Sequence, residues 1–400
     1  MRVLIADGFP DFARAELAAV GLEVDYRPEL RGDALAAAIA GAHVLVVRST
    51  EVPAAVFARA DALALVVRAG AGTNTIDRKA ASERGVYVAN CPGQNAIAVA
   101  ELTMGLVLAL DRRIPDNVAM LRDGKWRKKE FSRAQGLFGR RIGIAGLGRI
   151  GREVLARARA FGLEPTAWSR SLTPEQARAL GVGFRATLED LAAGADILTI
   201  HLALSPATRG VVSKPVLERL PRGAIFVNTS RGEIVDEAAL RDVIATLGVR
   251  AGLDVFHGEP EAGEADFASE TARLEGVYGT HHIGASTEQA QAAIARETVR
   301  IIRSFRESGE VPNCVNLATR SPARCQLVVR HYDKVGVLAR VLGALRTAGI
   351  NVEEMQNEIF EGAHAACARI RVSRAPPEEV LAGLRACAGE ILHVEVIDAA

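Results

Sequence analysis

Short apolar runs alternate with helical segments along the first part of the chain. The β-branched runs at 3–5, 44–47 and 65–67 predict strands, and the alanine-rich segment 33–40 has the apolar spacing of a helix. Because strands separated by helices are typical of parallel sheets, this alternation predicts an α/β fold.

A second series of the same kind follows after residue 140. It begins with an apolar strand at 141–145 and a helical segment at 149–161. Four more strands are expected near residues 164–168, 196–201, 224–228 and 250–254. The chain therefore contains two successive parallel-sheet regions.

Two longer helical patterns border this second series. Residues 96–121 carry apolar residues at helical spacing throughout, which predicts one long helix that joins two domains or forms a subunit contact. After residue 285 another helical pattern runs to about Glu307, and its length predicts that the chain crosses back to support the first region. We therefore expect the first domain to be discontinuous.

The last part of the chain has a different pattern. Proline, asparagine and serine in residues 311–323 predict a linker. Beyond it the order strand, helix, strand, strand, helix, strand is expected at 325–332, 335–348, 350–360, 363–372, 377–388 and 391–397. This βαββαβ order is the ferredoxin-like arrangement, and so small an appended module suggests regulation or assembly.

Residues 146–151 read Gly-Leu-Gly-Arg-Ile-Gly and stand between the strand at 141–145 and the helix at 149–161. Gly146 allows a tight turn, Gly148 lets the backbone approach a pyrophosphate, and Gly151 lets the helix pack closely on its strand. The helix N-terminus then presents unpaired N–H groups to the phosphates. The motif alone is weak evidence, but its placement predicts a dinucleotide cofactor.

These patterns together predict two Rossmann-like parallel-sheet domains, one of them discontinuous, and a C-terminal ferredoxin-like module. At 400 residues the chain is long enough for several cores. We expect a substrate-binding domain at 1–97 and 286–317, a dinucleotide-binding domain at 98–285, and the module at 323–400.

Composition excludes several classes of function. The net charge of +1 gives no global field that would attract nucleic acid or an anionic membrane. The five cysteines are odd in number and lack C-x-x-C spacing, which argues against a disulfide framework or a zinc site and favours a reducing compartment. No apolar stretch approaches the length of a membrane span. We therefore expect a cytoplasmic protein without a metal site.

The end of the second strand of the nucleotide-binding half normally carries an acid that accepts hydrogen bonds from the adenosine ribose. Here the residues are Trp168-Ser169-Arg170-Ser171, without an acid. An arginine between two serines could hold a 2′-phosphate, but it could also stack on adenine. The sequence therefore leaves NAD and NADP both open.

Three residues of the same half have the types that hydride transfer from a hydroxy acid requires. Arg231 could bind a carboxylate, His282 could take the hydroxyl proton, and Glu259 could orient the histidine. A single histidine is more often structural than catalytic, and the separation of Glu259 from His282 along the chain does not show that they meet.

Four motifs, in order and spacing, resemble those of the D-isomer-specific 2-hydroxyacid dehydrogenases. They are Gly146–Gly151, Asn228–Asp236, Leu253–Pro260 and His282–Thr287. The resemblance extends over residues 1–317 and is greatest to family members that oxidise 3-phosphoglycerate at the entry to serine biosynthesis. Supporting segments are Val47–Thr50, Arg68–Asn74, Asn90–Asn95 and Gly124–Lys129.

The resemblance implies roles for individual residues. Arg231 binds the substrate carboxylate and polarises the C2 oxygen, His282 is the general acid and base, and Glu259 pairs with it. Cofactor contacts are implied for Gly146, Gly148, Arg149, Ile150, Gly151, Ser169, Arg170, Thr229, Ser230, Asp254, His282 and Gly284. Substrate contacts are implied for Arg48, Ser49, Arg68, Gly70, Asn95, Lys128 and Arg231, with Lys128 or Lys129 supplied by the same or a neighbouring subunit of a homodimer or homotetramer.

The C-terminal module resembles an ACT domain, a small regulatory module. His331, Asp333 and Asn351 stand where family members inhibited by serine bind this effector. Asp333 and Val335 replace the more usual asparagine and proline, so a module that only pairs subunits remains an alternative.

Two other functions share the same motifs. A glyoxylate or hydroxypyruvate reductase would have the same three catalytic residues, and Arg170 would suit its phosphorylated cofactor. A cofactor-sensing corepressor built on the same scaffold is a binding protein rather than an enzyme, and fold alone does not exclude it. The basic residues at 48, 68 and 127–129 favour a phosphorylated substrate over the first alternative, and the appended module favours metabolism over the second.

Overall fold

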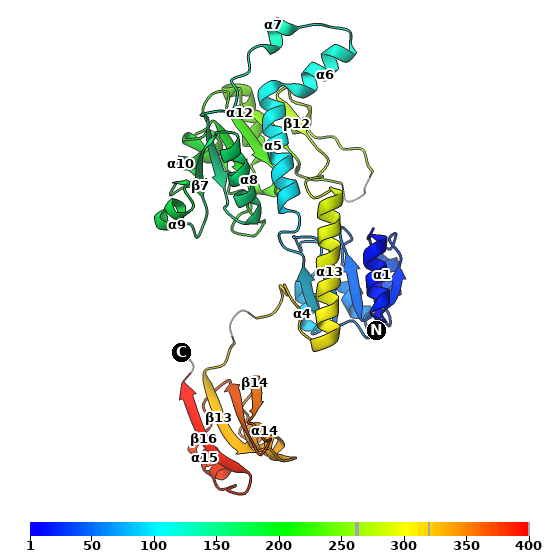
Figure 1. The fold of residues 1–400 in the computed structure, drawn as a ribbon, viewed down its shortest axis with the longest axis vertical. Coiled ribbons are helices and arrows are strands. Elements are labelled where there is room, and N and C mark those ends of the chain that lie inside the picture. Colours follow the sequence, from blue (N-terminus) through cyan, green and yellow to red (C-terminus); the bar gives the residue numbers. More distant parts are fainter. Residues whose placement is uncertain (261–263, 319–320, 399–400) are drawn as a thin grey trace. The chain divides into compact units, whose positions relative to one another are not determined.

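A computed structural model of the chain describes residues 1–260, 264–318 and 321–398. They form two compact units, Met1–Asn316 and Leu317–Ala400 (Figure 1). The first unit contains two parallel sheets and the second a single antiparallel sheet, so the predicted fold class is confirmed.

The first sheet has five parallel strands in the order β2-β1-β3-β4-β5. The strands are β1 (Arg2–Ile5), β2 (Glu23–Tyr26), β3 (Val44–Val47), β4 (Leu65–Arg68) and β5 (Tyr87–Asn90). Helices α1 (Asp11–Ala19), α2 (Gly32–Ala38), α3 (Ala54–Arg59) and α4 (Arg78–Glu83) connect them. The central strands are apolar on both faces because helices cover both faces.

The long helix α13 (Glu288–Ser308) covers one face of this first sheet (Figure 1). Its side chains Ile294 and Val299 are buried in the same core cluster as Val3 and Val67 of the sheet. The chain thus returns to the first sheet after completing the second, as the sequence predicted.

The second sheet has seven parallel strands in the order β12-β11-β10-β9-β6-β7-β8. The strands are β6 (Arg141–Ala145), β7 (Glu164–Trp168), β8 (Gly183–Phe184), β9 (Ile197–Ile200), β10 (Ile225–Asn228), β11 (Arg250–Leu253) and β12 (Val277–Gly279). The helices are α8 (Arg149–Ala160), α9 (Pro174–Ala179), α10 (Leu188–Ala193), α11 (Lys214–Leu217) and α12 (Glu237–Leu247). The strand order reverses between β6 and β9, and ligands of open α/β sheets bind at the carboxyl ends of strands beside such a point.

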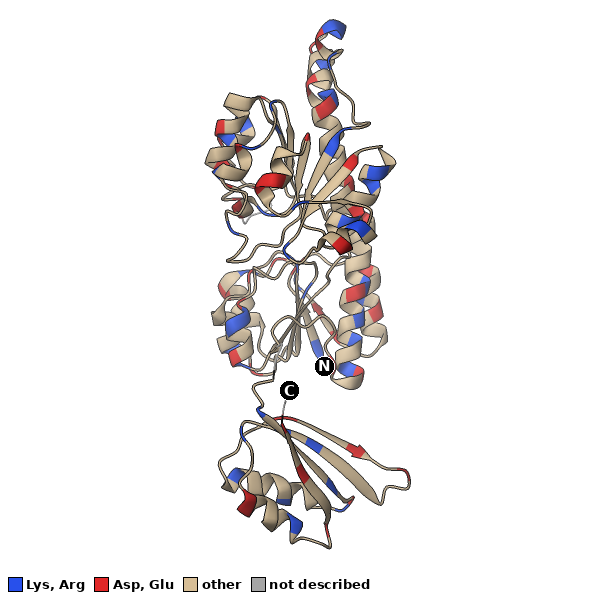
Figure 2. Cartoon of the chain, turned by 90° about the vertical axis from the view of Figure 1, so that its left-hand side faces the viewer, with Lys and Arg blue, Asp and Glu red and all other residues tan. Residues whose placement is uncertain are grey.

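The predicted single helix over 96–121 is wrong. The structure has α5 (Ala96–Arg112) and α6 (Ile114–Arg122), because Arg113 between them adopts a left-handed conformation with φ 50° and Pro115 starts the new helix. Apolar residues of α5 share a core cluster with α8 and the second sheet, whereas α6 buries none of its residues. We call residues 113–132, which include α6 and α7 (Lys128–Phe131), the arm, and Figures 1 and 2 show it projecting from the second sheet.

The predicted linker at 311–323 is wrong for its first residues. Cys314 forms an antiparallel β-bridge with Ala89 of β5. The Asn316 side chain accepts a hydrogen bond from Val88 N at 2.8 Å and donates one to Val86 O at 2.9 Å. Tertiary hydrogen bonds thus hold a segment whose composition is that of a loop. Residues 319 and 320 of the predicted linker lie outside the described residues.

The second unit is a four-stranded antiparallel sheet in the order β14-β15-β13-β16 with two helices on one face. Its elements are β13 (Cys325–Tyr332), α14 (Val337–Thr347), β14 (Val352–Ile359), β15 (Ala365–Val372), α15 (Glu378–Arg385) and β16 (Ile391–Asp398). The predicted ferredoxin-like βαββαβ module is confirmed. No helix among the described residues is both long and apolar enough to cross a membrane.

Candidate active site

The three glycines of the 146–151 loop meet three different spatial demands. Gly146 has φ 99°, and a Cβ atom there would lie 2.5 Å from the His201 carbonyl oxygen. A Cβ at Gly151 would lie 2.0 Å from the Gly146 carbonyl oxygen, so only glycine lets α8 approach β6 this closely. Gly148 has no neighbour within 4 Å of its Cβ position and therefore borders open space.

This open space suits a pyrophosphate. Gly148 caps α8 without a side-chain hydrogen bond, so the first N–H groups of a 12-residue helix have no side-chain cap. The loop also follows β6, directly beside the point where the strand order reverses. Ile150 follows in the first turn of α8, and Arg149 directs its guanidinium away to the Pro92 carbonyl oxygen, where it lies against Gly93.

Ser169 and Arg170 lie next to the glycine loop at the end of β7. Gly146 N donates to the Trp168 carbonyl oxygen at 2.7 Å, which places the residues after Trp168 beside the loop. No acid occurs in the turn, and the exposed Arg170 side chain takes part in no hydrogen bond or ion pair among the described residues. The turn therefore offers a ligand a positive charge and hydroxyl groups, but no carboxylate.

Asp254, buried after β11, holds the loop that carries His282. Its carboxylate accepts hydrogen bonds from Thr280 Oγ1 at 2.6 Å, Ile283 N at 2.8 Å and Gly284 N at 2.9 Å. His282 itself has φ 53°, a conformation that is uncommon outside glycine. Three hydrogen bonds to one carboxylate thus stabilise a backbone that a free loop would rarely adopt.

His282 and Glu259 form a hydrogen-bonded pair. The Nδ1 atom of His282 lies 2.6 Å from Oε2 of Glu259, while Oε1 of Glu259 accepts a hydrogen bond from Phe256 N at 2.7 Å. Burial by itself would raise the pKa of Glu259, but the hydrogen bond from His282 and the charges of His282 and Arg231 outweigh burial and lower this pKa. The pair leaves Nε2 of His282 as the ring atom available for proton transfer.

Arg231 follows β10 in a loop fixed by its own hydrogen bonds. Asn228 Nδ2 donates to the Arg231 carbonyl oxygen at 2.9 Å, and Ser230 Oγ donates to the Ile200 carbonyl oxygen at 2.7 Å. Thr229 Oγ1 lies 3.1 Å from Thr103 Oγ1 of α5, which ties the loop to that helix. Sequence reasoning did not assign these supporting roles, because Asn228 opens the Asn228–Asp236 motif without a role of its own and Thr103 belongs to no motif.

Arg231 extends from this loop to the first sheet. A Cβ atom at Gly72 would lie 2.9 Å from Nη2 of Arg231, so the guanidinium lies against the loop after β4. Burial and the positive charges of Arg231 and Arg48 lower the pKa of Arg68 to about 10. Three guanidinium groups, one from the end of β4 and two from the loops after β3 and β10, therefore share one electrostatic environment, which we call the arginine cluster (Arg48, Arg68 and Arg231).

The arginine cluster lacks a carboxylate of its own. No ion pair among the described residues includes Arg48, Arg68 or Arg231, and the buried Nε of Arg68 and Oδ1 of Asn95 have no hydrogen-bond partner there. The Arg68 guanidinium occupies the place that a side chain at Gly70 would need, which explains glycine at φ 156°. Three positive charges and the unpartnered Nε–H of Arg68 suit an anionic ligand with several oxygens.

The structure does not bring Lys128 and Lys129 to this cluster within one chain. Both lie on α7 of the arm, which projects from the second sheet (Figure 1). Ser49, in contrast, lies beside Arg48, with its backbone held by Asp7, a residue that sequence reasoning did not single out.

Asp333 and Asn351 of the second unit lie at opposite ends of its sheet. Asn351 precedes Val352, which pairs with Val372 of β15, and Val372 pairs with Cys325 at the start of β13. Asp333, in contrast, follows the end of β13. His331 is buried, with its ring nitrogens 2.8 Å from the Tyr332 carbonyl oxygen and 3.1 Å from Asn357 Oδ1. Eight residues of strand place the two exposed positions about 25 Å apart.

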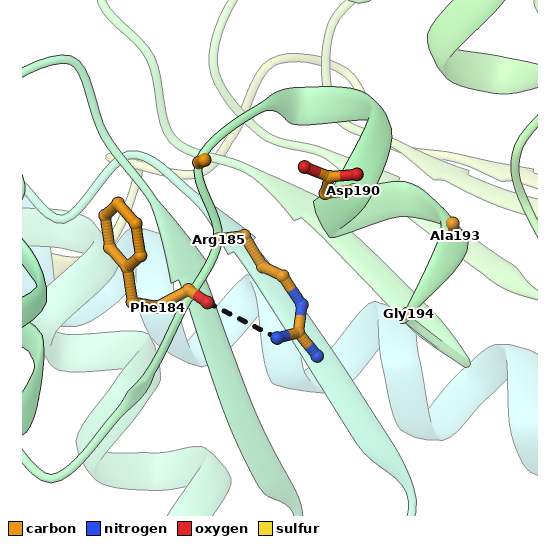
Figure 3. Close-up of a pocket in the computed structure, with 6 residues that line it drawn as sticks. Phe184, Arg185, Asp190, Ala193 and Gly194 are labelled. Carbon is orange, nitrogen blue, oxygen red and sulfur yellow. Dashed lines mark hydrogen bonds between the residues drawn. The ribbon is translucent and has the colours of Figure 1, made fainter.

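Two features of the described residues lie apart from this chemistry. A pocket of about 550 Å³ between the end of β8 and α10 is lined by Phe184, Arg185, Ala186, Asp190, Ala193 and Gly194 (Figure 3). It contains none of the residues that the sequence assigned to cofactor or substrate. Among the described residues no group of three or more His, Cys, Asp or Glu could hold a metal ion.

The glycine loop, the reversal in strand order and the pair of Glu259 and His282 define a dinucleotide-binding protein with a polar site at the carboxyl ends of the same parallel sheet. The sequence model of the D-isomer specific 2-hydroxyacid dehydrogenase NAD binding domain matches residues 104–284. Residues 104–284, which contain the second sheet, therefore form a NAD binding domain of the D-isomer specific 2-hydroxyacid dehydrogenase family.

Relatives and solved structures agree with this assignment. A D-3-phosphoglycerate dehydrogenase of Methanocaldococcus jannaschii is 37% identical over 79% of this chain and 60% of its own length. One of Mycobacterium tuberculosis is 39% identical over 88% of this chain and 66% of its own length. The chain thus spans less than two thirds of these relatives. The crystal structure of the TT0316 protein from Thermus thermophilus is similar with a TM-score of 0.72, 33% identity, and coverage of 79% of this chain and all of that one.

Proposed function

We propose that the protein is a D-3-phosphoglycerate dehydrogenase, which oxidises C2 of 3-phosphoglycerate to give 3-phosphohydroxypyruvate, the first step of serine biosynthesis. The observation that carries the proposal is the arginine cluster beside the pair of His282 and Glu259. Three guanidinium groups without a carboxylate suit a substrate that carries both a carboxylate and a phosphate. The names of the two relatives support the same substrate.

The chain's own residues would do the acid and base chemistry. Arg231 would bind the substrate carboxylate and polarise the C2 oxygen, while Nε2 of His282 removes the proton of the C2 hydroxyl. Glu259 would keep the imidazole oriented through Nδ1 and stabilise the positive charge that the proton brings. When bound, the nicotinamide ring supplies the acceptor for the hydride that leaves C2.

The remaining site residues would hold the substrate and cofactor in the geometry for this transfer. Arg48, Ser49, Arg68, Gly70 and Asn95 would form the substrate side, and the glycine loop with Thr229, Ser230, Asp254 and Gly284 the cofactor side. We assign the first sheet to substrate binding and the second to the dinucleotide. Asp254 would act mainly by fixing the 280–284 loop, since three donors of that loop occupy its carboxylate.

Lys128 would reach a substrate phosphate from a neighbouring copy of the chain. The arm exposes Ile114, Val118 and Leu121 on one helix face, and Trp126 is 78% exposed. Apolar surface of this kind is typical of an interface, so we propose a homodimer or homotetramer in which the arm is covered by a second copy. Sedimentation analysis of the protein and of a Leu121→Glu variant tests this association.

The cofactor would be NAD or NADP. Ser169 and Arg170, in a turn without an acid, would accept the 2′-phosphate of NADP. The same observation favours the second candidate, a glyoxylate or hydroxypyruvate reductase, which would use the phosphorylated cofactor on a smaller substrate. A cytoplasmic location belongs to the proposal and agrees with the five free cysteines.

The second unit would act as an ACT domain that binds serine or pairs subunits. Because Asp333 and Asn351 lie at opposite ends of the sheet, one small effector cannot touch both in a single copy. An antiparallel pairing of β14 edges from two copies would bring Asn351 of one near Asp333 of the other. Serine inhibition would therefore require association of the units.

A turnover assay tests the proposed function. Purified protein is offered 3-phosphoglycerate, glycerate, lactate and, in the reverse direction, hydroxypyruvate and glyoxylate, each with both cofactors. We expect the highest kcat/KM with the phosphorylated substrate. Preference for glyoxylate or hydroxypyruvate would establish the second candidate, and absence of turnover with tight cofactor binding would indicate a cofactor-sensing binding protein.

A further inference from the structure

Asp7 anchors the loop that carries Arg48. Asp7 lies two residues after β1 and is 6% exposed. Its Oδ2 atom accepts hydrogen bonds from three successive backbone N–H groups, Arg48 at 2.6 Å, Ser49 at 3.0 Å and Thr50 at 3.0 Å. Three consecutive amides aimed at one oxygen fix the path of the backbone directly after β3.

Further contacts hold Asp7 itself. Its Oδ1 atom accepts a hydrogen bond from Arg31 Nη2 at 3.2 Å, and Thr50 Oγ1 donates to the Ala6 carbonyl oxygen at 3.1 Å. The ends of β1 and β3, which are neighbours in the sheet, are thus joined by a polar network in a largely buried place. Such a network is costly to break because each freed amide would be left without a partner.

The anchor lies close to the arginine cluster. The negative charge of Asp7 raises the pKa of Arg68, against the stronger lowering by burial and by Arg231 and Arg48. Arg48 has no ion-pair partner among the described residues, so the rest of the protein holds Arg48 through its backbone N–H group. The direction of its guanidinium therefore depends on the loop that Asp7 fixes.

We infer that Asp7 is a positioning residue that sets Arg48 for the anionic substrate by fixing the backbone of residues 48–50. This inference rests on the proposed function for the identity of the substrate. The hydrogen bonds between Asp7 and residues 48–50 do not depend on that function. The acceptor oxygen rather than the charge is what the geometry requires. An asparagine keeps such an oxygen for the three amides and loses only the contact with the half-exposed Arg31, whereas an alanine removes both.

The test compares Asp7→Asn, Asp7→Ala and the control Asp25→Ala. Asp25 belongs to the same sheet and pairs with Arg2 and Arg27, away from the 48–50 loop. With 3-phosphoglycerate we expect Asp7→Ala to raise KM about 10-fold or more with kcat within threefold of the wild type, since one to three lost hydrogen bonds correspond to such a factor. Asp7→Asn should stay within threefold for both, and Asp25→Ala should leave KM unchanged. An unchanged KM in a folded Asp7→Ala protein would overturn the inference.

Amide hydrogen exchange provides a second measurement on the wild-type protein. The N–H groups of residues 48–50 should exchange much more slowly than those of the loop 71–74, which has no such anchor among the described residues. Equal exchange in both loops would also overturn the inference, even where Asp7→Ala fails to fold. If the wild-type protein turns over no 2-hydroxy acid, the proposed function fails, while the exchange measurement still decides the role of Asp7.

Discussion

Nδ1 of His282 and Oε2 of Glu259 lie 2.6 Å apart, although 23 positions separate the two residues in the chain. Glu259 follows β11 and His282 follows β12, and these two strands are neighbours in the second sheet. The carboxyl ends of adjacent parallel strands thus bring the imidazole and the carboxylate together. The pair leaves Nε2 of the imidazole for the acid and base role that we propose.

Replacing His282 by alanine should lower kcat by ~10²–10⁴, because the variant lacks the general base that we propose for the C2 hydroxyl. The neighbouring His281 provides a matched control, since it is exposed and has no hydrogen bond among the described residues. The variant His281→Ala should retain nearly full activity in the same spectrophotometric assay. Equal losses in both variants would assign the effect to the loop rather than to the imidazole.

Replacing Glu259 by glutamine should lower kcat by roughly 10–10²-fold, the factor that a charged hydrogen bond of about 1.5–3 kcal/mol provides. The lowered pKa of Glu259 keeps its carboxylate ionised at neutral pH, so the variant removes a full negative charge beside the imidazole. The KM for substrate should change less than kcat. A variant with wild-type kcat would show that the pair is only structural.

Two alanine variants separate the roles of the glycine loop. In Gly151→Ala the new Cβ meets the Gly146 carbonyl oxygen, and we expect the free energy of unfolding to fall by about 1–3 kcal/mol. In Gly148→Ala the Cβ enters open space, so stability without cofactor should stay near that of the wild type. Both variants should bind cofactor more weakly by calorimetry. A Gly148→Ala protein with unchanged affinity would place the pyrophosphate elsewhere.

The variant Arg170→Ala tests the 2′-phosphate site. Loss of a charge-assisted hydrogen bond should raise the KM for NADP by about 10-fold and leave the KM for NAD within threefold. Arg178→Ala, which removes an exposed arginine from α9, is the control. If the wild-type protein uses NAD as well as or better than NADP, Arg170 does not form a pocket for the 2′-phosphate.

His201 should make the protein sensitive to mild acid. Burial lowers the pKa of His201 to about 3, and its Nδ1 is buried without a hydrogen-bond partner. Because the unfolded chain binds this proton near its ordinary pKa of about 6.5 while the folded protein does not, stability falls as the pH drops below 6.5. Between pH 6.5 and pH 5 the loss from this residue is about 2 kcal/mol. Denaturant unfolding of the wild type and of His201→Gln at both pH values should show a smaller loss in the free energy of unfolding for the variant. Equal losses in the two proteins would refute the role of His201.

Local patterns in the sequence were sufficient for most of the fold. The strands around the glycine loop and the whole βαββαβ module were predicted, because apolar periodicity and glycine depend on neighbours a few residues apart. The break at Arg113 was missed since apolar spacing continues across it, and one left-handed residue changes the direction of the chain without changing the pattern. The segment 313–316 was mistaken for a linker because its partners, at Val86 and Val88, are more than 200 positions away.

The amino-acid sequence by itself determined the two parallel-sheet regions, the cofactor loop and the residue types that a dehydrogenase needs. Only the tertiary structure decided that Glu259 meets His282, that Arg48, Arg68 and Arg231 share one environment, and that Asp7 holds the loop of Arg48. The physical reason is that helices and strands follow from short-range backbone preferences, whereas a site depends on which strand ends become neighbours. Strand order in a sheet is fixed by the packing of the whole core, and this information is spread over residues far apart in the chain.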